Sequence, residues 1–346
     1  MLNIAYYRKY RPKSFKEVLG QEHIVKALQG AIQEGRIFHA YLFAGPRGTG
    51  KTSLARIFAR EIGTSEKDIY ELDAASNTSV EDIRELTEGA RTLPFESEKK
   101  VYIIDEVHML SKSAFNAFLK TLEEPPQHVV FILATTELEK LPDTVVSRCQ
   151  FFTFKKPTNE VLKKAIERVA KGEGFEIDKS GADLIAMLGD GSFRDTIGIF
   201  EQVSNTTKGG KIKVEDVEAI TGSPRGEIIH QLIRAILDNH LKNSIILLRK
   251  VADSNVDMKV FLKMILRDMR LIMLLKIAPE MEGEILSEIS AEEAKVFNEL
   301  KNHKNAESLS KILREFVSVG NELNHTNIPE LPIELALIRL IPQNEK

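Results

Sequence analysis

Two hydrophobic patterns divide this chain. Between Ala40 and Glu139, short continuous apolar runs lie between amphipathic stretches, whereas from Asn159 onward the apolar residues recur mainly at helical spacing. Continuous apolar runs are typical of strands that are buried on both faces in a parallel sheet covered by helices. Strands and helices that alternate along the chain predict an α/β domain. We therefore expect an α/β domain followed by a largely helical remainder.

The predicted elements of the first part follow from the apolar runs and the residues that end them. Three segments each contain a buried strand, and the first strand continues into a glycine-rich turn and an amphipathic helix; these segments are Ala40–Gly63, Lys99–Leu110 and His128–Glu139. Helices are predicted between the strands, over Ser79–Thr92 and Ser111–Glu124. Pro125 and Pro126 end the second helix, because proline disfavours helical backbone in the residue before it.

The second part reads as helices broken by polar loops. The helical pattern from Asn159 to about Gly222 is interrupted at two glycine-containing stretches and at the loop Asn205–Lys213, and Ser223-Pro224 reads as a linker. A long helix is predicted over Asp257–Ala278. We expect three domains: a nucleotide-binding α/β domain over residues 1–157, a small helical domain over 158–222 and an all-helical domain over 223–346.

Length and charge agree with several domains and set limits on partners. The chain has 346 residues, of which 42% are hydrophobic. This length exceeds what a domain with a single core usually has. With 48 basic and 51 acidic residues, no overall field draws it onto nucleic acid or an anionic membrane. The first sixteen residues contain five basic and no acidic side chains, which suits either a solvated arm or a local binding patch.

Cysteine content and hydropathy exclude several classes of protein. A single cysteine, Cys149, excludes an internal disulfide and a multi-cysteine zinc site, so no zinc is expected. The beginning of the chain lacks the apolar core of a signal peptide, and no apolar run reaches membrane-spanning length. We therefore expect a soluble, cytoplasmic protein with no membrane partner.

The motif that carries most of the chemistry is the stretch GPRGTGKT. It matches the pattern G-x-x-x-x-G-K-[ST] between a predicted strand and a predicted helix, which is the context a phosphate-binding P-loop requires. Its backbone N–H groups and the helix N-terminus would hold phosphates. Lys51 would reach the β- and γ-phosphates of ATP, and the Thr52 hydroxyl would bind Mg²⁺. The predicted nucleotide-binding residues are Gly45, Pro46, Arg47, Gly48, Thr49, Gly50, Lys51 and Thr52.

An acidic pair ends the second predicted strand. Asp105 would hold Mg²⁺ directly or through water, and Glu106 would orient and deprotonate the attacking water. An acidic N-cap for the following helix is the alternative role, which the nearby P-loop makes the weaker one. His108 has no companion at metal-ligand spacing, so we interpret it as structural or solvent-facing.

Two further polar residues suit a sensor of the γ-phosphate. Thr135 and Thr136 end the third predicted strand, and we assign the sensor to Thr136; capping of the strand end is the alternative. Arg194 lies in the first turn of a helix for which Ser192 is the predicted N-cap. A cation there opposes the helix dipole, which indicates a ligand for Arg194, although a salt bridge to Asp195 is also open.

Arg148 raises a separate question, because it lies at the edge of an apolar run with only Asp143 as a nearby acid. A buried arginine requires a carboxylate or a phosphate. That partner is either Asp143, in an intrachain ion pair, or a group from elsewhere in this chain or in another one.

Several motifs together resemble one family. The stretches YRKYRPKSFKEVLGQEHIVKAL, HAYLFAGPRGTGKTSLARIFA, ELDAASNTSVEDIREL, VYIIDEVHMLSKSAFNAFLKTLEEPP, FILATTELEKLPDTVVSRCQFF and GDGSFRDT span the first 200 residues or so. In this combination they resemble the AAA+ ATPases of the clamp-loader group, and within it the gamma/tau family of bacterial DNA polymerase III. The helical remainder is similar to the family's collar domain in position and composition, and residues 158–222 correspond to its helical lid.

The resemblance implies roles that the residues alone leave open. Arg148 would be an arginine finger that enters a neighbouring subunit's ATP site, and Cys149 an ordinary small apolar residue. Arg194 would be the second sensor, which contacts the γ-phosphate within its own subunit. The segment from Tyr7 to Val18 would pack near the adenine. The four-cysteine zinc module common in bacterial members is missing, and the chain resembles the short gamma form without the tau extension.

By this resemblance the protein is an ATP-driven subunit that opens a sliding clamp and loads it on primed DNA. Its partners would be the delta and delta-prime subunits, further gamma copies, the clamp and DNA phosphates. DNA contacts are predicted at Asn77, Thr78, Arg84 and Lys112, although a solvated helix face explains the last two equally well. The alternatives are a helicase or Holliday-junction motor, an archaeal-type small loader subunit and a non-hydrolysing scaffold of the delta-prime kind.

Overall fold

A computed structural model describes residues 4–76, 79–207, 209–254, 256–323 and 325–342. The chain forms two compact units. The first comprises Met1–Val169 and Gly189–Glu201, and the second comprises Ala170–Leu188 and Gln202–Lys346. Two of the three boundaries fall inside helices, α7 (Asn159–Glu173) and α9 (Phe193–Thr206), and the third follows Leu188. The predicted division into three domains stays a prediction.

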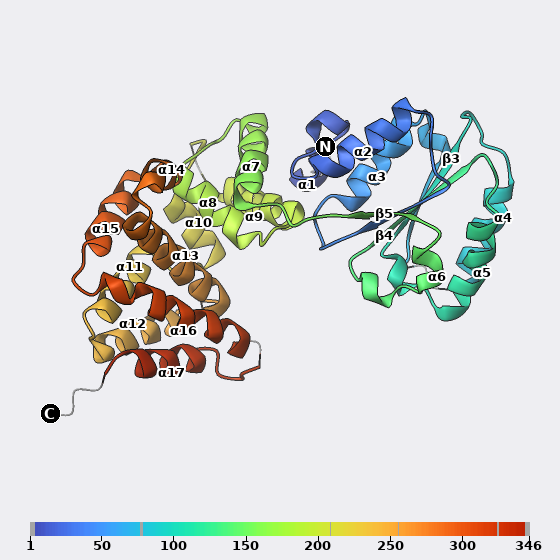
Figure 1. Cartoon of the computed structure of the whole chain (residues 1–346). Helices are drawn as coiled ribbons and strands as arrows, with labels where there is room; N and C mark the ends of the chain where they lie inside the picture. Colours follow the sequence, from blue (N-terminus) through green and yellow to red (C-terminus); the bar gives the residue numbers. More distant parts are fainter. Residues whose placement is uncertain (1–3, 77–78, 208, 255, 324, 343–346) are drawn as a thin grey trace. The chain divides into compact units, whose positions relative to one another are not determined.

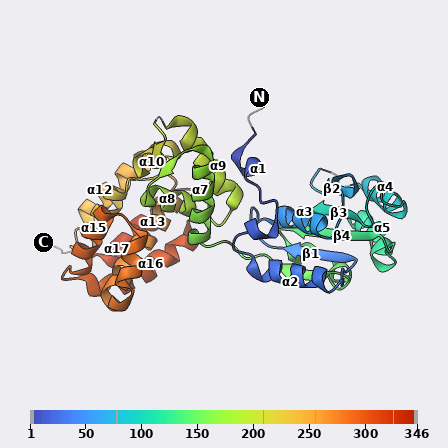
Figure 2. The ribbon, with the colours of Figure 1, turned by 90° about the horizontal axis from the view of Figure 1, so that it is seen from above.

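The first unit is built around a five-stranded sheet in the order β2-β3-β4-β1-β5, in which all neighbours are parallel. Its strands are β1 (Ala40–Ala44), β2 (Ile69–Asp73), β3 (Lys100–Asp105), β4 (Val129–Thr135) and β5 (Gln150–Thr153). Figure 2 shows β2, β3, β4 and β1 succeeding one another across the sheet. Because the strands are parallel, the carboxyl ends of β1, β3 and β4 meet at one edge, where Ala44 pairs with Thr135.

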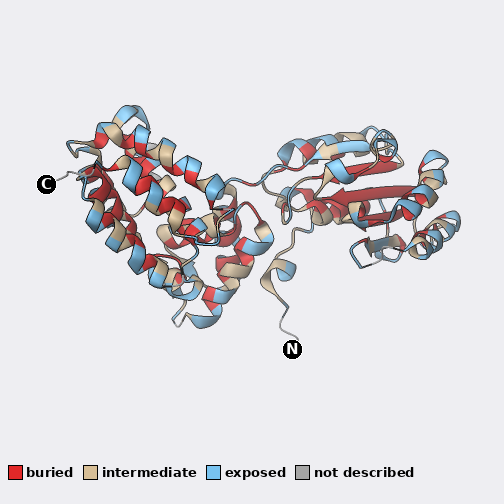
Figure 3. Ribbon diagram, turned by 90° about the horizontal axis from the view of Figure 1, so that it is seen from below, coloured by how far each residue is buried: buried red, intermediate tan, exposed pale blue. Residues whose placement is uncertain are grey.

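Helices cover both faces of this sheet (Figure 1). One face packs against α2 (Glu22–Gln33) and α3 (Lys51–Glu61), and the other against α4 (Val80–Arg91), α5 (Lys112–Glu123) and α6 (Asp143–Val146). Successive side chains of β1 alternate between the two cores: Tyr41 and Phe43 face α2 and α3, whereas Leu42 faces the opposite side. Figure 3 shows the resulting buried strands between helices with exposed outer faces. The predicted α/β class is confirmed.

The apolar pattern predicted the three central strands and missed the two edge strands. All residues of β1 and β4 are buried, whereas in β2 the side chains of Tyr70 and Glu71 are exposed. In β5, Phe151 is 41% exposed. An edge strand has a neighbour on one side only, so it lacks the continuous burial that makes a central strand visible in a sequence.

The remaining helices are mostly those that the sequence pattern predicts. Besides α7 and α9 they are α1 (Tyr6–Lys9), α8 (Lys179–Leu188), α10 (Val214–Thr221), α11 (Gly226–Leu237), α12 (Leu241–Asp253), α13 (Met258–Ile277), α14 (Glu282–Glu288), α15 (Ala291–Lys301), α16 (Leu309–Glu322) and α17 (Leu331–Leu340). The two-residue strands β6 (Glu176–Ile177) and β7 (Lys211–Ile212) pair in parallel within the predicted breaks. Over the described residues, no helix has the length and apolar character that a membrane crossing requires.

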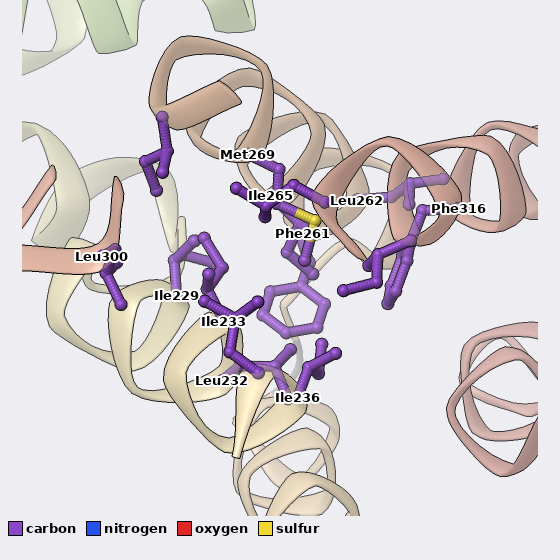
Figure 4. Packing of buried hydrophobic residues seen from close by; sticks show 14 of the residues in the cluster. Ile229, Leu232, Ile233, Ile236, Phe261, Leu262, Ile265, Met269, Leu300 and Phe316 are labelled. Atoms are coloured by element: carbon purple, nitrogen blue, oxygen red, sulfur yellow. The ribbon is translucent and has the colours of Figure 1, made fainter. Parts of the chain in front are cut away.

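The core of the second unit lies among the helices after residue 225. Figure 4 shows Phe261, Ile265 and Met269 of α13 packed against α11, with Phe316 of α16 on another side. These four side chains are fully buried, so the helices of the second unit pack around an apolar core of their own.

A charged cluster lies beside that core. Arg267 of α13 contacts three carboxylates: Asp183 of α8 at 2.5 Å, Asp268 at 2.8 Å and Glu293 of α15 at 3.3 Å. Burial disfavours the charge of Arg267, but Asp268, Asp183 and Glu293 outweigh that effect and raise its pKa above the ordinary value. This cluster joins α8, which the sequence places in the region 158–222, to helices of the region 223–346.

Candidate active site

A cavity of about 580 Å³ opens in the first unit, at the carboxyl ends of the central strands. It has the size of a small-molecule site. Among the described residues that line it are many that the sequence predicted; they are Tyr7, Val18, Arg47, Gly48, Thr49, Gly50, Lys51, Thr52, Asp105, Glu106 and Arg194. Segments far apart in the chain therefore converge on one place.

The P-loop between β1 and α3 has a backbone that only glycine tolerates at two points. Gly48 has φ +73°, and a Cβ there would lie 2.0 Å from Oγ of Ser192. A Cβ on Gly45 would lie 2.4 Å from the carbonyl oxygen of Phe154. The loop is thus held closely against the side chain of Ser192 and the backbone of Phe154, which leaves room for glycine alone at these two positions.

Lys51 is turned into the cradle. Only 5% of its surface is exposed, and its Nζ donates hydrogen bonds to the carbonyl oxygens of Gly45 at 2.8 Å and Pro46 at 3.0 Å. Burial lowers the pKa of Lys51, and the charges of Glu106 and Asp105 act in the opposite direction. The ammonium group is therefore desolvated, and its hydrogen-bond partners in the described part of the chain are neutral carbonyl oxygens, which favours an anionic ligand beside it.

Thr52 and Asp105 form the pair that a magnesium ion would need. The Thr52 hydroxyl donates to Oδ2 of Asp105 at 2.6 Å. Within the described part of the chain, no group of three or more His, Cys, Asp or Glu side chains could hold a metal alone. Mg²⁺ does not require such a group, because it is commonly held by one or two protein oxygens together with phosphate oxygens and water. The donor set fits Mg²⁺ bound jointly with a nucleotide.

Glu106 and Thr136 are in direct contact. Oε2 of Glu106 accepts hydrogen bonds from the backbone N–H of Thr136 at 3.1 Å and from its hydroxyl at 2.9 Å. Thr136 follows the last residue of β4 and does not line the cavity among the described residues, whereas Glu106 does. The predicted base and the predicted sensor thus occupy adjacent strand ends, and Thr136 reaches the site through Glu106.

Arg194 enters the cavity from the first turn of α9. The predicted N-cap is present, because Ser192 Oγ accepts the backbone N–H of Asp195 at 3.2 Å. The guanidinium carbon of Arg194 lies 5.7 Å from the centre of the Tyr7 ring. Across the described residues Arg194 forms no salt bridge with Asp195, so that alternative is not the arrangement in this structure.

Sequence reasoning missed a set of arginines at the mouth of the cavity. Arg8, Arg11 and Arg56 line an adjoining hollow of about 510 Å³, together with Thr52, Asp105 and Arg194. Burial lowers the pKa of Arg11, and the neighbouring charge of Arg56 adds to the effect. The basic stretch at the start of the chain was the available signal, but only the fold shows that Arg8 and Arg11 turn toward the P-loop.

Arg148 lies outside the cavity and is partly exposed. Its side chain is 33% exposed and forms a salt bridge of 2.6 Å with Glu123, the last residue of α5. It also donates to the carbonyl oxygen of Thr144 at 2.7 Å. The suggested pair with Asp143 is therefore replaced by a pair with Glu123, which is 25 residues distant in sequence.

The predicted DNA contacts have ordinary surface environments where the structure describes them. Arg84 on α4 pairs with Glu81 at 2.8 Å, and both side chains are largely exposed. Lys112 is exposed at the first position of α5. Asn77 and Thr78 lie outside the described residues. These surroundings are those of solvated helix residues and do not distinguish a DNA contact from a free surface.

Comparison with known proteins shows similarity to subunits of DNA polymerase III. Residues 20–77 and 63–158 match the family of the DNA polymerase III delta subunit. Residues 212–345 match domain III of the DNA polymerase III subunits gamma and tau. The chain is 36% identical to the tau subunit of Bacillus subtilis over 97% of its own length and 63% of that protein. It is 34% identical to the gamma subunit of Buchnera aphidicola from Baizongia pistaciae, over 98% and 97% of the two chains.

The chain belongs to the gamma/tau family of DNA polymerase III subunits. The match to the Buchnera gamma subunit extends over nearly all of both proteins, which confirms the family that the sequence motifs resemble. The chain spans less than two thirds of the Bacillus tau subunit, and 47% of the tau subunit of Escherichia coli at 35% identity.

A solved structure supports the fold of this family member. The RuvB Holliday-junction branch migration motor of Thermotoga maritima matches with a TM-score of 0.54 and 26% identity, over 66% of this chain and 79% of that one. The parallel sheet and P-loop are thus those of an AAA+ P-loop NTPase, and the predicted fold class is confirmed.

Proposed function

We propose that this protein is an ATP-hydrolysing subunit of the DNA polymerase III clamp loader, which opens the sliding clamp and loads it on primed DNA. The observation that carries the proposal is the cavity in which Lys51 and Thr52 of the P-loop lie beside Asp105 and Glu106, in a chain of the gamma/tau family. Bacterial replication takes place in the cytoplasm, and we assign the protein to that compartment.

The P-loop binds and orients the triphosphate. The glycine backbone turns N–H groups toward phosphate oxygens, and Lys51 exchanges its carbonyl partners for the β- and γ-phosphates. Thr52 and Asp105 would hold Mg²⁺, which would supply positive charge beside the phosphates of the nucleotide. Tyr7 and Val18 line the same cavity and would contact the adenosine part of the nucleotide.

Glu106 and the two sensor residues act on the γ-phosphate side. Glu106 accepts a proton from water while its other carboxylate oxygen stays with Thr136. Arg194 places a guanidinium at the cavity from α9 and so links this helix to the nucleotide. Removal of one such donor typically costs about 10²- to 10³-fold in turnover.

Arg148 completes the site of a neighbouring subunit. Its partial exposure and its position outside its own cavity leave it accessible to another chain. Within its own chain it is held by Glu123, so assembly would exchange one carboxylate for the phosphates of the neighbour. A guanidinium that meets nucleotide only in the assembled state gives ATP a different affinity for assembled and free subunits, which is what lets ATP drive assembly. The neighbours would be delta, delta-prime or further copies of this chain.

DNA would be bound through its phosphates, since a loader must act at any sequence. The candidates are Arg84, Lys112, Asn77 and Thr78. Contact with the clamp and DNA would stimulate hydrolysis, which then releases the closed clamp.

The test is ATP turnover by the purified chain, measured alone, with delta and delta-prime partners, and with clamp and primed DNA added. We expect low turnover alone and strong stimulation in the full mixture. Arg148→Ala should retain ATP binding and lose most stimulated turnover, on the order of 10³- to 10⁵-fold for arginine fingers. Lys120→Ala, on the exposed face of α5, is the matched control, because it removes a surface cation from the same region.

Two outcomes would replace the proposal. Stimulation by branched or double-stranded DNA without a clamp, accompanied by translocation, would favour a motor of the RuvB kind, to which the fold is similar. Assembly with partners but no hydrolysis would favour a scaffold subunit.

A further inference from the structure

His108 is a buried histidine beside the proposed base, and the mechanism above gives it no role. It lies in a short 3-10 turn, Val107–Met109, directly after Glu106. Its side chain is 5% exposed. Of the two roles that the sequence left open, structural or solvent-facing, the second is therefore excluded. Both ring nitrogens face polar groups at the end of β4.

The hydrogen bonds of His108 form a closed ring with two residues. Nε2 lies 3.1 Å from Oε1 of Glu137, and Nδ1 lies 3.0 Å from Oγ1 of Thr135. Thr135 Oγ1 in turn accepts the backbone N–H of Glu137 at 3.1 Å. Two bonds thus connect the turn after β3 with the residues that end β4, and the third joins those residues to each other.

The partners determine which nitrogen carries the proton. Lys140, which lies 2.7 Å from Glu137, lowers the pKa of that carboxyl group, so Glu137 is ionised and only accepts hydrogen bonds. Nε2 of His108 must therefore carry a hydrogen and donate it to Glu137. Nδ1 and the Thr135 hydroxyl form the second hydrogen bond of the ring.

This ring holds the two neighbours of Thr136. Thr135 and Glu137 flank Thr136 in sequence, and Thr136 provides both donors to Oε2 of Glu106. Nδ1 of His108 lies 3.5 Å from the same Oε2. Among the described residues, no group donates a hydrogen bond to Oε1 of Glu106, so this oxygen remains available to a water molecule.

Glu106 needs such support because its backbone is unusual. Its φ of +48° places it in the left-handed region, which residues other than glycine seldom adopt. Conformations of this kind persist where the surroundings over-determine them. The backbone N–H of Glu106 bonds Oδ1 of Asp105 at 3.0 Å, and His108 anchors the turn two residues later.

The order carboxylate, imidazole, hydroxyl also occurs where a hydroxyl is activated as a nucleophile. Thr135 cannot act in that way here, because it is fully buried in β4 and already accepts the N–H of Glu137. The arrangement can orient its neighbours, and Glu106 is the neighbour with chemistry to perform.

We propose that His108 is a positioning residue for hydrolysis: its hydrogen bonds to Thr135 and Glu137 set the place of Thr136, and through it the carboxylate of Glu106. The inference rests on the proposed function, in which Glu106 is the base. It assigns to His108 an effect on the chemical step and none on nucleotide affinity, because the P-loop belongs to other segments of the chain.

The experiment compares three substitutions in the complete clamp-loader mixture. His108→Phe keeps the ring volume and removes both polar contacts; His108→Asn keeps an acceptor near Nδ1; His108→Gln keeps a donor near Nε2. We expect His108→Phe to lower kcat by about 10- to 100-fold, since small misplacements of reacting groups cost this much. KM and the Kd of a fluorescent ATP analogue should stay within about twofold. His108→Asn should restore most of kcat, and His108→Gln less.

Several outcomes are decisive. A kcat of His108→Phe close to that of the parent protein overturns the inference. The inference also fails if the Asn and Gln variants lose kcat equally and their Tm falls in parallel. If His108→Phe does not fold, Thr135→Val takes its place, because it removes the hydroxyl that contacts Nδ1 of His108 with little change in shape. An unchanged kcat in that variant contradicts the inference in the same way. Glu106→Gln separates the two proposals: if it retains turnover, the proposed function fails, whereas its loss together with an unaffected His108→Phe leaves the function and removes the role of His108.

Discussion

The P-loop of the first unit and the charged cluster of the second each bury a cation, but they surround it differently. Lys51 is 5% exposed and is held by two neutral carbonyl oxygens. The side chain of Arg267 is 24% exposed and is held by three carboxylates on three helices. Burial lowers the pKa of Lys51, whereas the pKa of Arg267 is raised because its acidic partners outweigh burial.

The difference separates a site from a structural joint. A cation whose charge is not matched by its own chain gains most from an anionic ligand, so its environment is that of a binding group. A cation that already has an excess of carboxylates has nothing further to bind, and its removal leaves buried negative charge. The first arrangement serves function and the second serves stability, and each substitution below tests that contrast.

The largest effect on stability is expected from Arg267→Met. It would leave Asp183, Asp268 and Glu293 without a counterion, which typically costs about 3–5 kcal/mol. Urea unfolding of the variant should show this loss, while the affinity of the first unit for nucleotide stays the same. Arg270→Met, on the exposed face of the same helix, is the control and should change little. Equal stability of the two variants would contradict a structural role for the cluster.

Lys51→Met should show the reverse behaviour. It removes a desolvated charge whose hydrogen bonds go to two neutral carbonyl oxygens, so stability should be unchanged or slightly higher. Turnover should fall by about 10²- to 10³-fold, or about 2.7–4 kcal/mol, as for other donors to developing charge. Steady-state ATPase and thermal unfolding measured on one preparation check both statements. A variant that hydrolyses ATP normally, or that unfolds much earlier, would remove the contrast with Arg267.

Asp68 sharpens the comparison because it is a buried anion that forms no salt bridge with the residues that the structure describes. Burial would raise the pKa of Asp68, but the backbone N–H groups of Phe95, Glu96 and Ser97, at 2.5–2.9 Å, lower it to about 2. An aspartate in the unfolded chain has a pKa of about 3.9. Because the folded pKa is the lower one, the stabilisation is present above about pH 4 and disappears as the pH falls toward 2.

Asp68→Asn should therefore flatten the dependence of unfolding free energy on pH between about 4 and 2. Denaturant unfolding of both proteins at a series of pH values provides the measurement. Parallel curves over this range would show that the three N–H groups do not hold an ionised carboxylate.

The smallest effect belongs to Arg84→Ala. The pair with Glu81 is exposed, and such pairs contribute about 0–1 kcal/mol. Stability should change by less than about 0.5 kcal/mol, and nucleotide affinity should not change. A reduced salt dependence of DNA binding would support the predicted phosphate contact, and an unchanged one would leave Arg84 as a solvated residue.

Apolar continuity was enough to predict the central strands and not the edge strands. In β1, β3 and β4 nearly every residue is buried, so each strand stands out as an apolar run. In β2, Tyr70 and Glu71 face solvent, and the strand resembles a loop in the sequence. Similarly, the strands β6 and β7 are too short for any periodicity to indicate them.

Side-chain partners were the least predictable feature of the site. Asp143 is five residues from Arg148 in the sequence, but the fold places Glu123 against the guanidinium. His108 has no signal of its own, because Thr135 and Glu137 become its neighbours only when β3 and β4 pair. Such contacts depend on strand order, which local patterns do not encode.

By itself, the sequence determined the class of fold, the P-loop, the acidic strand end and the family, because each depends on residue types at short, regular spacing. The tertiary structure alone decided that Arg8 and Arg11 line the hollow beside the nucleotide cavity, that Thr136 holds Glu106, and that Arg267 unites α8 with α13 and α15. These are contacts between segments tens to hundreds of residues apart. Their distances follow from the packing of whole strands and helices, and no short stretch of the chain contains that information.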